Sequence, residues 1–146
     1  MKPINYLLIL CLLFVLGCSA KIERKDILVF FNYHCQLIDD FDPAILNHYK
    51  DTAKIHSLKN ISKTKVEMSG ADVKKSGIEL IEHAKEIGDT FTYSNIEVSY
   101  SGTLIKIEAN RFSRLQNYTD TAYYMVVEKN SKGQYQIVEE YLETND

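Results

Sequence analysis

The apolar residues of this chain change their spacing at Gly88, and no other feature of the sequence limits the fold as strongly. Before Gly88 they recur every three or four positions, which is the period of an amphipathic helix. After Gly88 they alternate with polar residues, which is the period of a half-buried strand. Helices gathered first and strands gathered last predict an α+β domain whose helices cover one face of a curved antiparallel sheet.

Three N-terminal helices are expected before Gly88. The first spans residues 24–39, where an apolar stripe follows one face: Ile27, Phe30, Phe31, His34, Leu37 and Ile38. Cys35 lies on this stripe, which favours a buried, inert thiol over a reactive one. The third helix spans residues 71–87, and Gly88 supplies its C-terminal stop.

The second helix is expected to be short. Asp42 is typical of an N-cap and Pro43 of a first helical turn, so the helix begins there and continues towards Ala53. Residues 54–68 are rich in lysine and have no clear period, which indicates mostly loop. Within that loop, Ile55 and Val66 are the positions that could belong to short strands.

Two hairpins are expected after Gly88. Alternating segments over residues 96–100 and 105–109 flank a turn at Gly102, and two more follow over residues 121–129 and 134–143. Consecutive strands joined by turns predict an antiparallel meander.

Length and charge narrow the function classes. A chain of 146 residues builds about one core once a targeting segment is removed. Its 17 basic and 20 acidic residues give a net charge of −3, which does not favour a nucleic-acid partner. No metal is expected, because the histidines are scattered and none has a paired ligand spacing with a cysteine: His34, His48, His56, His83. No other cofactor is expected, since the sequence has no glycine-rich phosphate loop or hydrolase elbow.

The N-terminal stretch indicates a cellular address. Lys2 precedes an apolar run over residues 6–16, which is typical of a secretory signal and shorter than the roughly 20 residues of a spanning helix. Residues 15–18, Val-Leu-Gly-Cys, resemble the lipobox of bacterial lipoproteins. The resemblance implies cleavage before Cys18 and a diacylglycerol on its thiol; a plain cleaved signal is the alternative. Cys35 then remains as the single thiol of the mature chain, so no internal disulfide is expected.

We therefore expect a signal peptide over residues 1–17, a lipidated tether over residues 18–22 and a single domain over residues 23–146. Several acyl chains, palmitate among them, would hold the domain at a membrane. Ser19 in place of aspartate resembles the sorting pattern for the outer membrane, which predicts a cell-envelope protein that faces the periplasm.

Residues 23–143 resemble the nuclear transport factor 2-like superfamily, which includes SnoaL-like polyketide cyclases and ketosteroid isomerases. The resemblance rests on the order of elements and on three short segments: Ile-Asp-Asp-Phe-Asp-Pro at 38–43, Tyr-Lys-Asp-Thr-Ala at 49–53, and Gly-Gln-Tyr-Gln-Ile at 133–137. It implies a cone-shaped α+β fold. It does not imply a function, because this fold hosts enzymes, binding proteins and assembly domains.

The same resemblance suggests where steroid-isomerase chemistry would lie. Tyr33 matches the tyrosine that donates to the oxyanion, but the base position falls near Ser57, beside His56, and the strand acid falls near Met125. That mechanism is therefore not expected, although a different acid–base pair such as Tyr33 with His56 stays open.

Arg111 is the most informative strand residue, because alternation places it on the same side as the apolar residues of its strand. A buried arginine needs a partner, and Glu139 or Glu140 could form an ion pair with it or leave it as a site for an anion. A strand end that lets Arg111 reach solvent is the alternative. Together with Tyr33, Tyr49 and Glu139, Arg111 is expected to line any ligand pocket.

Seven tyrosines fall in the sheet region, where they pack across strands or form an interface: Tyr93, Tyr100, Tyr118, Tyr123, Tyr124, Tyr135, Tyr141. The leading hypothesis is a lipid-anchored envelope protein that binds a partner protein or a small apolar ligand without converting it, with a homodimer through the sheet as a further interaction. The alternative is a metal-independent isomerase, cyclase or hydrolase of the SnoaL-like kind, with Tyr33, His56 and Arg111 in its pocket. An accessory domain of a larger envelope machine is the third.

Overall fold

The computed structural model describes residues 24–145. The signal peptide, the tether and Cys18 lie outside the described residues. Residues 24–32 belong to one compact unit and residues 33–145 to a second. The helix predicted over residues 24–39 is present over those residues, and its last seven, 33–39, belong to the second unit. Among residues 24–145, no helix is both long and apolar enough to cross a membrane.

The chain turns after this helix, and a new helix begins where Asp42 and Pro43 predict one. The Asp42 side chain accepts a 2.8 Å hydrogen bond from the Ala44 amide and caps the 3-10 helix η1 (Pro43–His48). The prediction that this helix continues to Ala53 is wrong, because strand β1 (Tyr49–Lys59) begins directly after it. Pairing of β1 within the sheet, where Ala53 is buried, overrides the local helical pattern.

The lysine-rich segment predicted to be mostly loop is a hairpin. Strand β2 (Thr64–Ser69) pairs antiparallel with β1, from Lys54 opposite Ser69 to Lys59 opposite Thr64. The strand period was hidden because β2 is an edge strand in which no residue is buried, and lysines are common on exposed edges.

Helix α2 (Gly70–Ile87) agrees with the third predicted helix. Ser69 and Asp72 form a reciprocal capping box at its start, and Gly88 ends it in the left-handed region at φ 66°. A Cβ on Gly77 would lie 2.4 Å from the Leu46 side chain, so this glycine lets α2 pack closely on η1.

The predicted hairpins are also present. The first consists of β3 (Phe91–Ser101) and β4 (Leu104–Ser113), with Gly102 at φ 62° in the turn, and the second of β6 (Tyr124–Lys129) and β7 (Tyr135–Thr144). A short strand, β5 (Tyr118–Asp120), pairs with β4 before β6 begins.

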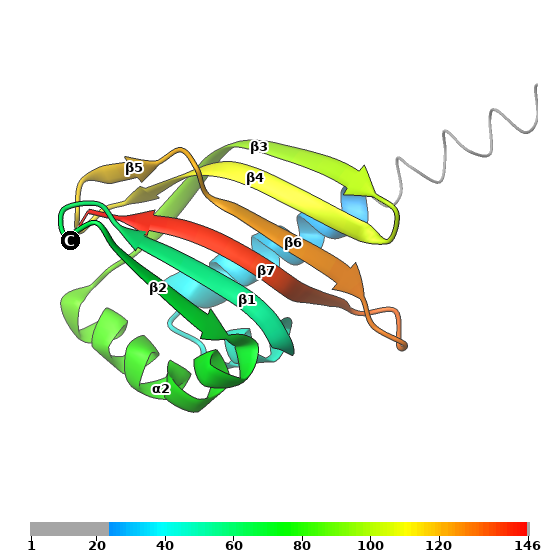
Figure 1. The fold of residues 1–146 in the computed structure, drawn as a ribbon, viewed down its shortest axis with the longest axis horizontal. Helices are drawn as coiled ribbons and strands as arrows, with labels where there is room; N and C mark the ends of the chain where they lie inside the picture. The colour runs from blue at the N-terminus through cyan, green and yellow to red at the C-terminus, as the bar shows by residue number, and fades with distance from the viewer. Residues whose placement is uncertain (1–23, 146) are drawn as a thin grey trace, which may run out of the picture. The chain divides into compact units, whose positions relative to one another are not determined.

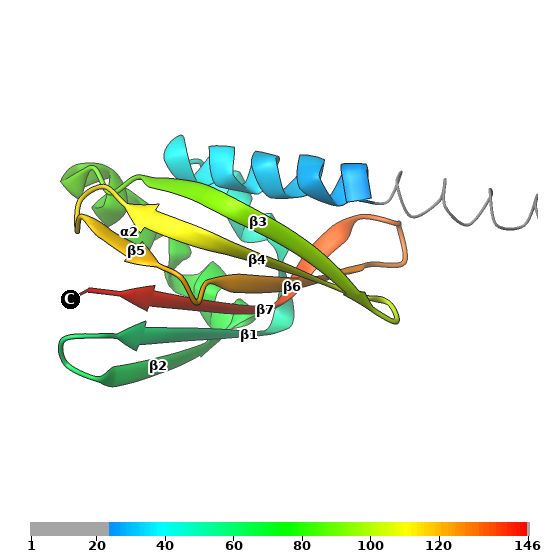
Figure 2. The same ribbon diagram turned by 90° about the horizontal axis from the view of Figure 1, so that it is seen from above.

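The seven strands form one sheet in the order β2-β1-β7-β6-β4-β3, with β5 on β4 (Figures 1 and 2). The predicted α+β class is confirmed: helices pack against a curved sheet that stays open between β2 and β3. The sheet is mixed rather than wholly antiparallel, since β1 runs parallel to β7. Its inward side chains form the core of the second unit: Ala53, Ile55, Ile105, Ile107, Met125, Val127, Ile137.

Candidate functional site

A bulge in β7 decides which acidic side chain enters the interior. Val127 pairs with Ile137 and Val126 with Glu139, so one extra residue of β7 lies between these pairs. Beyond the bulge, the alternation of the β7 side chains between the two faces of the sheet is reversed. Ile137 and Glu140 are therefore both buried, while Glu139 lies on the opposite, outer face of the sheet.

Glu140 is held by two tyrosine hydroxyls. Tyr49 donates a 2.7 Å hydrogen bond to Oε2, and Tyr123 donates a 3.0 Å hydrogen bond to Oε1. Burial raises the pKa of Glu140, and the two hydroxyl donors and the charge of Arg111 oppose this shift without cancelling it. Burial also raises the pKa of Tyr49 and of Tyr123, so both phenols stay protonated and continue to donate.

Arg111 lies in the interior with 8% of its surface exposed. Its Nη2 donates a 2.9 Å hydrogen bond to the Glu143 carbonyl, and its guanidinium carbon lies 4.5 Å from the Phe91 ring centroid. The Asp120 carboxylate lies beside it, with Nε to Oδ2 at 3.9 Å, and Nε makes no hydrogen bond. Glu139, one of the two expected partners, lies on the outer face.

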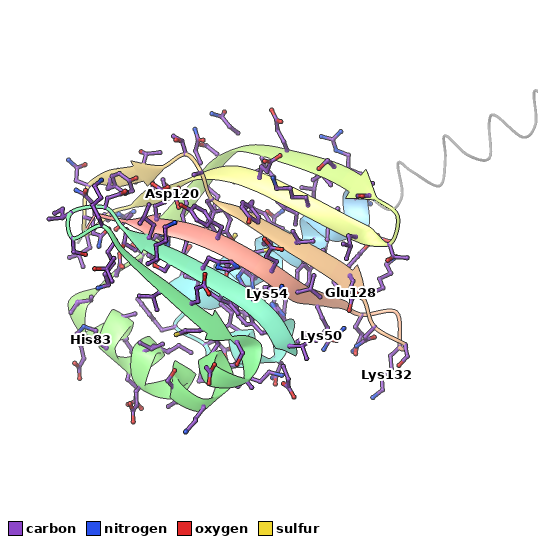
Figure 3. The ribbon with its side chains drawn as sticks, in the orientation of Figure 1. Lys50, Lys54, His83, Asp120, Glu128 and Lys132 are labelled. Carbon is purple, nitrogen blue, oxygen red and sulfur yellow. The ribbon has the colours of Figure 1, made fainter. Side chains whose placement is uncertain are left out.

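Asp120 is positioned by the backbone at the end of β5 (Figure 3). It accepts hydrogen bonds of 2.8 Å from the Ala122 amide and 2.7 Å from the Glu143 amide, while burial raises its pKa. The charge of Arg111 thus lies among the carboxylates of Asp120 and Glu140. An arginine already compensated in this way does not require an anionic ligand.

Cys35 and Tyr93 border this cluster. Burial raises the pKa of the Cys35 thiol to about 12, with Asp39 and Glu140 adding to the shift, so the thiol is not nucleophilic at neutral pH. The Tyr93 ring meets the Tyr123 ring edge-on, with centroids 5.4 Å apart.

Two histidines meet beside the cluster. His34 Nδ1 and His48 Nδ1 are 3.1 Å apart, and their rings stack with centroids separated by 5.3 Å. His34 is fully buried; burial and then the neighbouring His48 lower its pKa to about 3. Burial also lowers the pKa of the half-buried His48. Both imidazoles are therefore neutral at pH 7, with one Nδ1–H donating to the other Nδ1.

An apolar cleft of about 150 Å³ lies where the first helix, η1 and α2 meet the start of β3. Eight of its nine lining residues are apolar, and Asp89 is the polar exception; the apolar ones are Leu37, Ile38, Phe41, Ile45, Leu80, Ile81, Ala84 and Phe91. The side chain of Leu80 is 52% exposed, so the cleft opens to solvent along α2.

Two further hollows, of about 290 and 420 Å³, lie on the outer face of the sheet, where Figure 3 shows Lys54. They share His56 and Glu67, whose Nδ1 and Oε1 atoms are 3.4 Å apart. Tyr124 and Tyr141 line the smaller of the two hollows, and their rings stack with centroids 5.7 Å apart and planes 9° apart. These hollows are wide and mixed in polarity.

The structure does not bring the expected catalytic residues together. Tyr33 is 50% exposed and contacts His48, with ring centroids 5.7 Å apart. His56 lies on the outer sheet face and Arg111 in the interior. Among residues 24–145, no three histidine, cysteine or acidic side chains are grouped for a metal ion.

Of the expected pocket residues, Tyr49 and Arg111 belong to the same buried cluster. Glu139 instead accepts a 2.6 Å hydrogen bond from Tyr124 on the outer face. The sequence indicated Tyr123 only as one of seven sheet tyrosines, and it gave no expectation for Asp120. The signal available for Asp120 was its place before a turn-forming stretch, because aspartate accepts hydrogen bonds from backbone amides two residues on.

Comparison with known proteins places the fold. No family model matches this sequence, and no curated protein matches it. A nuclear transport factor 2-like (NTF2-like) protein of unknown function from Pseudomonas putida aligns over 84% of this chain and 87% of its own, with 15% identity and a TM-score of 0.67. A second NTF2-like protein of unknown function, from Shewanella oneidensis, aligns over 84% and 99%, with 14% identity and a TM-score of 0.66.

A protein from Parabacteroides distasonis, designated a candidate ketosteroid isomerase, aligns over 74% of this chain and 79% of its own, with 14% identity and a TM-score of 0.51. Identities this low carry the fold and not the function. With helices packed on a curved, open, mixed sheet, this chain has the NTF2-like fold.

Proposed function

We propose that this chain is a lipid-anchored protein of the bacterial cell envelope whose domain binds a small apolar ligand without converting it. The lipobox-like residues 15–18 support the anchor at Cys18, and Ser19 supports an outer-membrane location facing the periplasm. The observation that carries the binding function is the apolar cleft between the first helix, η1 and α2.

The cleft suits a ring or a short alkyl group. Its volume of about 150 Å³ equals that of an engineered apolar cavity in another protein, of about 150 Å³, which binds benzene. Ligand sites are mainly apolar with few polar groups, and this lining includes one carboxylate, Asp89, at its rim. Burying an apolar ligand here gains about 25 cal/mol per Å² of apolar surface removed from water.

Absence of turnover is supported by how the buried polar groups are used. Each Glu140 oxygen already accepts a tyrosine hydrogen bond, and both Asp120 oxygens accept backbone hydrogen bonds. A general acid or base must reach the reacting proton of its substrate, at about 2.6–3.2 Å or through one water. These two carboxylates are buried, and the hydrogen bonds that they accept come from neighbouring groups of the protein.

The test uses the full-length lipoprotein, extracted in mild detergent from membranes of its own host. Native and denaturing mass spectra should differ by a non-covalent adduct of small-molecule mass. A dimer mass would instead direct attention to the outer sheet face, where a second copy or an envelope protein would contact Tyr124 and Tyr141. Spectra without adduct or partner would count against binding.

A pair of variants locates the ligand. Ala84→Leu places a larger side chain in the cleft, whereas Ala71→Leu makes the same change at an exposed position of the same helix. Benzene titrated into the protein should shift the methyl NMR signals of Ile81. We expect Ala84→Leu to weaken this binding at least about tenfold, as a filled cavity loses its ligand contacts, and Ala71→Leu to leave it unchanged.

A metal-independent isomerase of the SnoaL-like kind is the second candidate. The buried Glu140, with its raised pKa and two tyrosine donors, and the likeness in fold to a candidate ketosteroid isomerase favour it. Its test is turnover of a small β,γ-unsaturated ketone. Activity that Glu140→Gln abolishes and Glu139→Gln retains would establish an enzyme; no activity in the unmodified protein leaves the binding function.

A further inference from the structure

We propose that the His34–His48 contact is a proton-sensitive latch that keeps the apolar cleft assembled at neutral pH and loosens it in acid. The inference rests on the proposed ligand function and adds its regulation. The latch joins the first helix and η1, which supply three of the nine lining residues of the cleft: Leu37, Ile38 and Ile45. His34 is on the first helix, which also carries Leu37, and His48 ends η1, which also carries Ile45.

Proton counting gives the latch its direction. Two Nδ1 atoms 3.1 Å apart have room for one hydrogen between them. A neutral pair satisfies this contact, because one ring donates and the other accepts. When both rings are protonated, both Nδ1 atoms carry a hydrogen, and two donors of like charge face each other. The closed contact therefore excludes the doubly protonated pair.

The described neighbours of the pair are mainly aromatic or apolar. On the first helix, the Tyr33 ring is tilted against the His48 ring, and burial raises the pKa of the Cys35 thiol, which therefore stays protonated near pH 7. From β1, the Tyr49 ring meets His34 edge-on, with centroids 6.1 Å apart, and its hydroxyl is engaged by Glu140 of β7.

Helix α2 packs on η1 at an apolar point, where Gly77 meets the Leu46 side chain. Lys74 of α2 and Asp51 of β1 form an ion pair at 2.6 Å, so their charges compensate each other. The buried Glu140 reaches this corner through its hydrogen bond with Tyr49, and its titration has the opposite sign, since protonation removes a buried charge. The acid response of the histidines can thus be separated from that of Glu140 by variants that leave Glu140 in place.

The magnitude follows from linkage. An opened corner exposes both imidazoles, which then titrate at about 6.5, whereas the closed corner resists protonation. Between pH 7.5 and 5.5, the ratio of open to closed protein should rise about tenfold for each histidine that takes up a proton on opening. Opening would separate Leu37 from Ile45 and weaken ligand binding by the same coupling.

The test measures amide hydrogen exchange of the full-length protein at pH 7.5 and 5.5, corrected for the intrinsic exchange rate. His48→Asn keeps an amide oxygen near the Nδ1 position but cannot titrate there, and His83→Asn makes the same change at an exposed site on α2 (Figure 3). Opening of residues 43–49 should rise about a hundredfold in acid in the unmodified protein and in His83→Asn, where both histidines take up a proton on opening, but only about tenfold in His48→Asn, where His34 alone does so. Equal acid opening in all three proteins, or in none, would overturn the latch.

Two further readouts complete the design. In the unmodified protein, NMR should show His34 neutral throughout the range from pH 7.5 to 5.5; titration of its closed state near 6.5 would overturn the proposal without any variant. Benzene affinity should fall as opening increases in acid. An affinity that stays constant while opening increases would overturn the coupling between opening and ligand binding. Absence of benzene binding even at pH 7.5 would refute the proposed ligand function alone, because exchange still decides the latch.

Discussion

Tyr49 and Glu140 lie 91 positions apart in the chain, yet the hydroxyl of the first donates a 2.7 Å hydrogen bond to the carboxylate of the second. The bond joins the beginning of β1 to the middle of β7, the two strands that run parallel. It therefore links the parallel strand pair, which local sequence does not specify. The hydrogen bond lies in the interior, where water cannot replace a lost donor.

Removing this donor should cost stability. Tyr49→Phe leaves one oxygen of a buried carboxylate without its partner, so we expect the free energy of unfolding to fall by about 1–3 kcal/mol in urea denaturation at pH 7. Tyr33→Phe, which removes a hydroxyl at a half-exposed site, should change it by less than about 0.5 kcal/mol. Equal losses in the two variants would show that the hydrogen bond is not the cause.

The charge of Glu140 should make its replacement depend on pH. Its folded pKa is raised above the ordinary 4.5, so its contribution to stability is present below pH 4.5 and is lost as the pH rises through the folded pKa. Glu140→Gln is neutral at every pH. Relative to the unmodified protein, this variant should thus be more stable at pH 7 than at pH 4, as measured by urea unfolding at both values. The reverse order would mean that Glu140 is stabilised as a carboxylate.

Arg111 should be needed most when its carboxylate neighbours are ionised. Arg111→Met removes the cation between Asp120 and Glu140, and breaking a buried charge pair costs about 3–5 kcal/mol. The loss should shrink at pH 4, where protonation removes the uncompensated charges. Arg114→Met, at an exposed position beyond the same strand, serves as the control. A loss that is equal at pH 7 and pH 4 would point to packing on Phe91 rather than to charge.

Gly70 should resist substitution because of backbone contact. A Cβ there would lie 1.9 Å from the Lys50 carbonyl oxygen, so Gly70→Ala forces β1 and the start of α2 apart. We expect a loss of about 1–3 kcal/mol, as for other overpacked sites. Gly102→Asn tests a glycine that has open space and a left-handed φ, which asparagine tolerates, and should cost less than about 1 kcal/mol. Thermal or urea unfolding of both variants measures the two losses of stability, and equal losses would contradict the backbone contact as the cause.

Local chemistry alone determined much of this fold. The first helix and α2 follow from an apolar stripe with period 3.6, the corner from Asp42 before Pro43, and the turn between β3 and β4 from Gly102. Each of these signals acts within a few residues, through capping, fixed φ or amphipathic burial. Each element can therefore be predicted without knowing which other elements it packs against.

Only the tertiary structure decided β1, β2 and the buried polar cluster. Residues 49–59 become a strand because β2 and β7 pair with them on either side, and β7 is remote in the chain and becomes a neighbour only when the chain folds. The sequence offered Glu139 and Glu140 alike as partners of Arg111, and the bulge opposite Val126 and Val127 is what places Glu140 inward with Ile137. A one-residue shift in pairing moves every later side chain to the other face, and that shift is set by the neighbouring strand rather than by β7 itself.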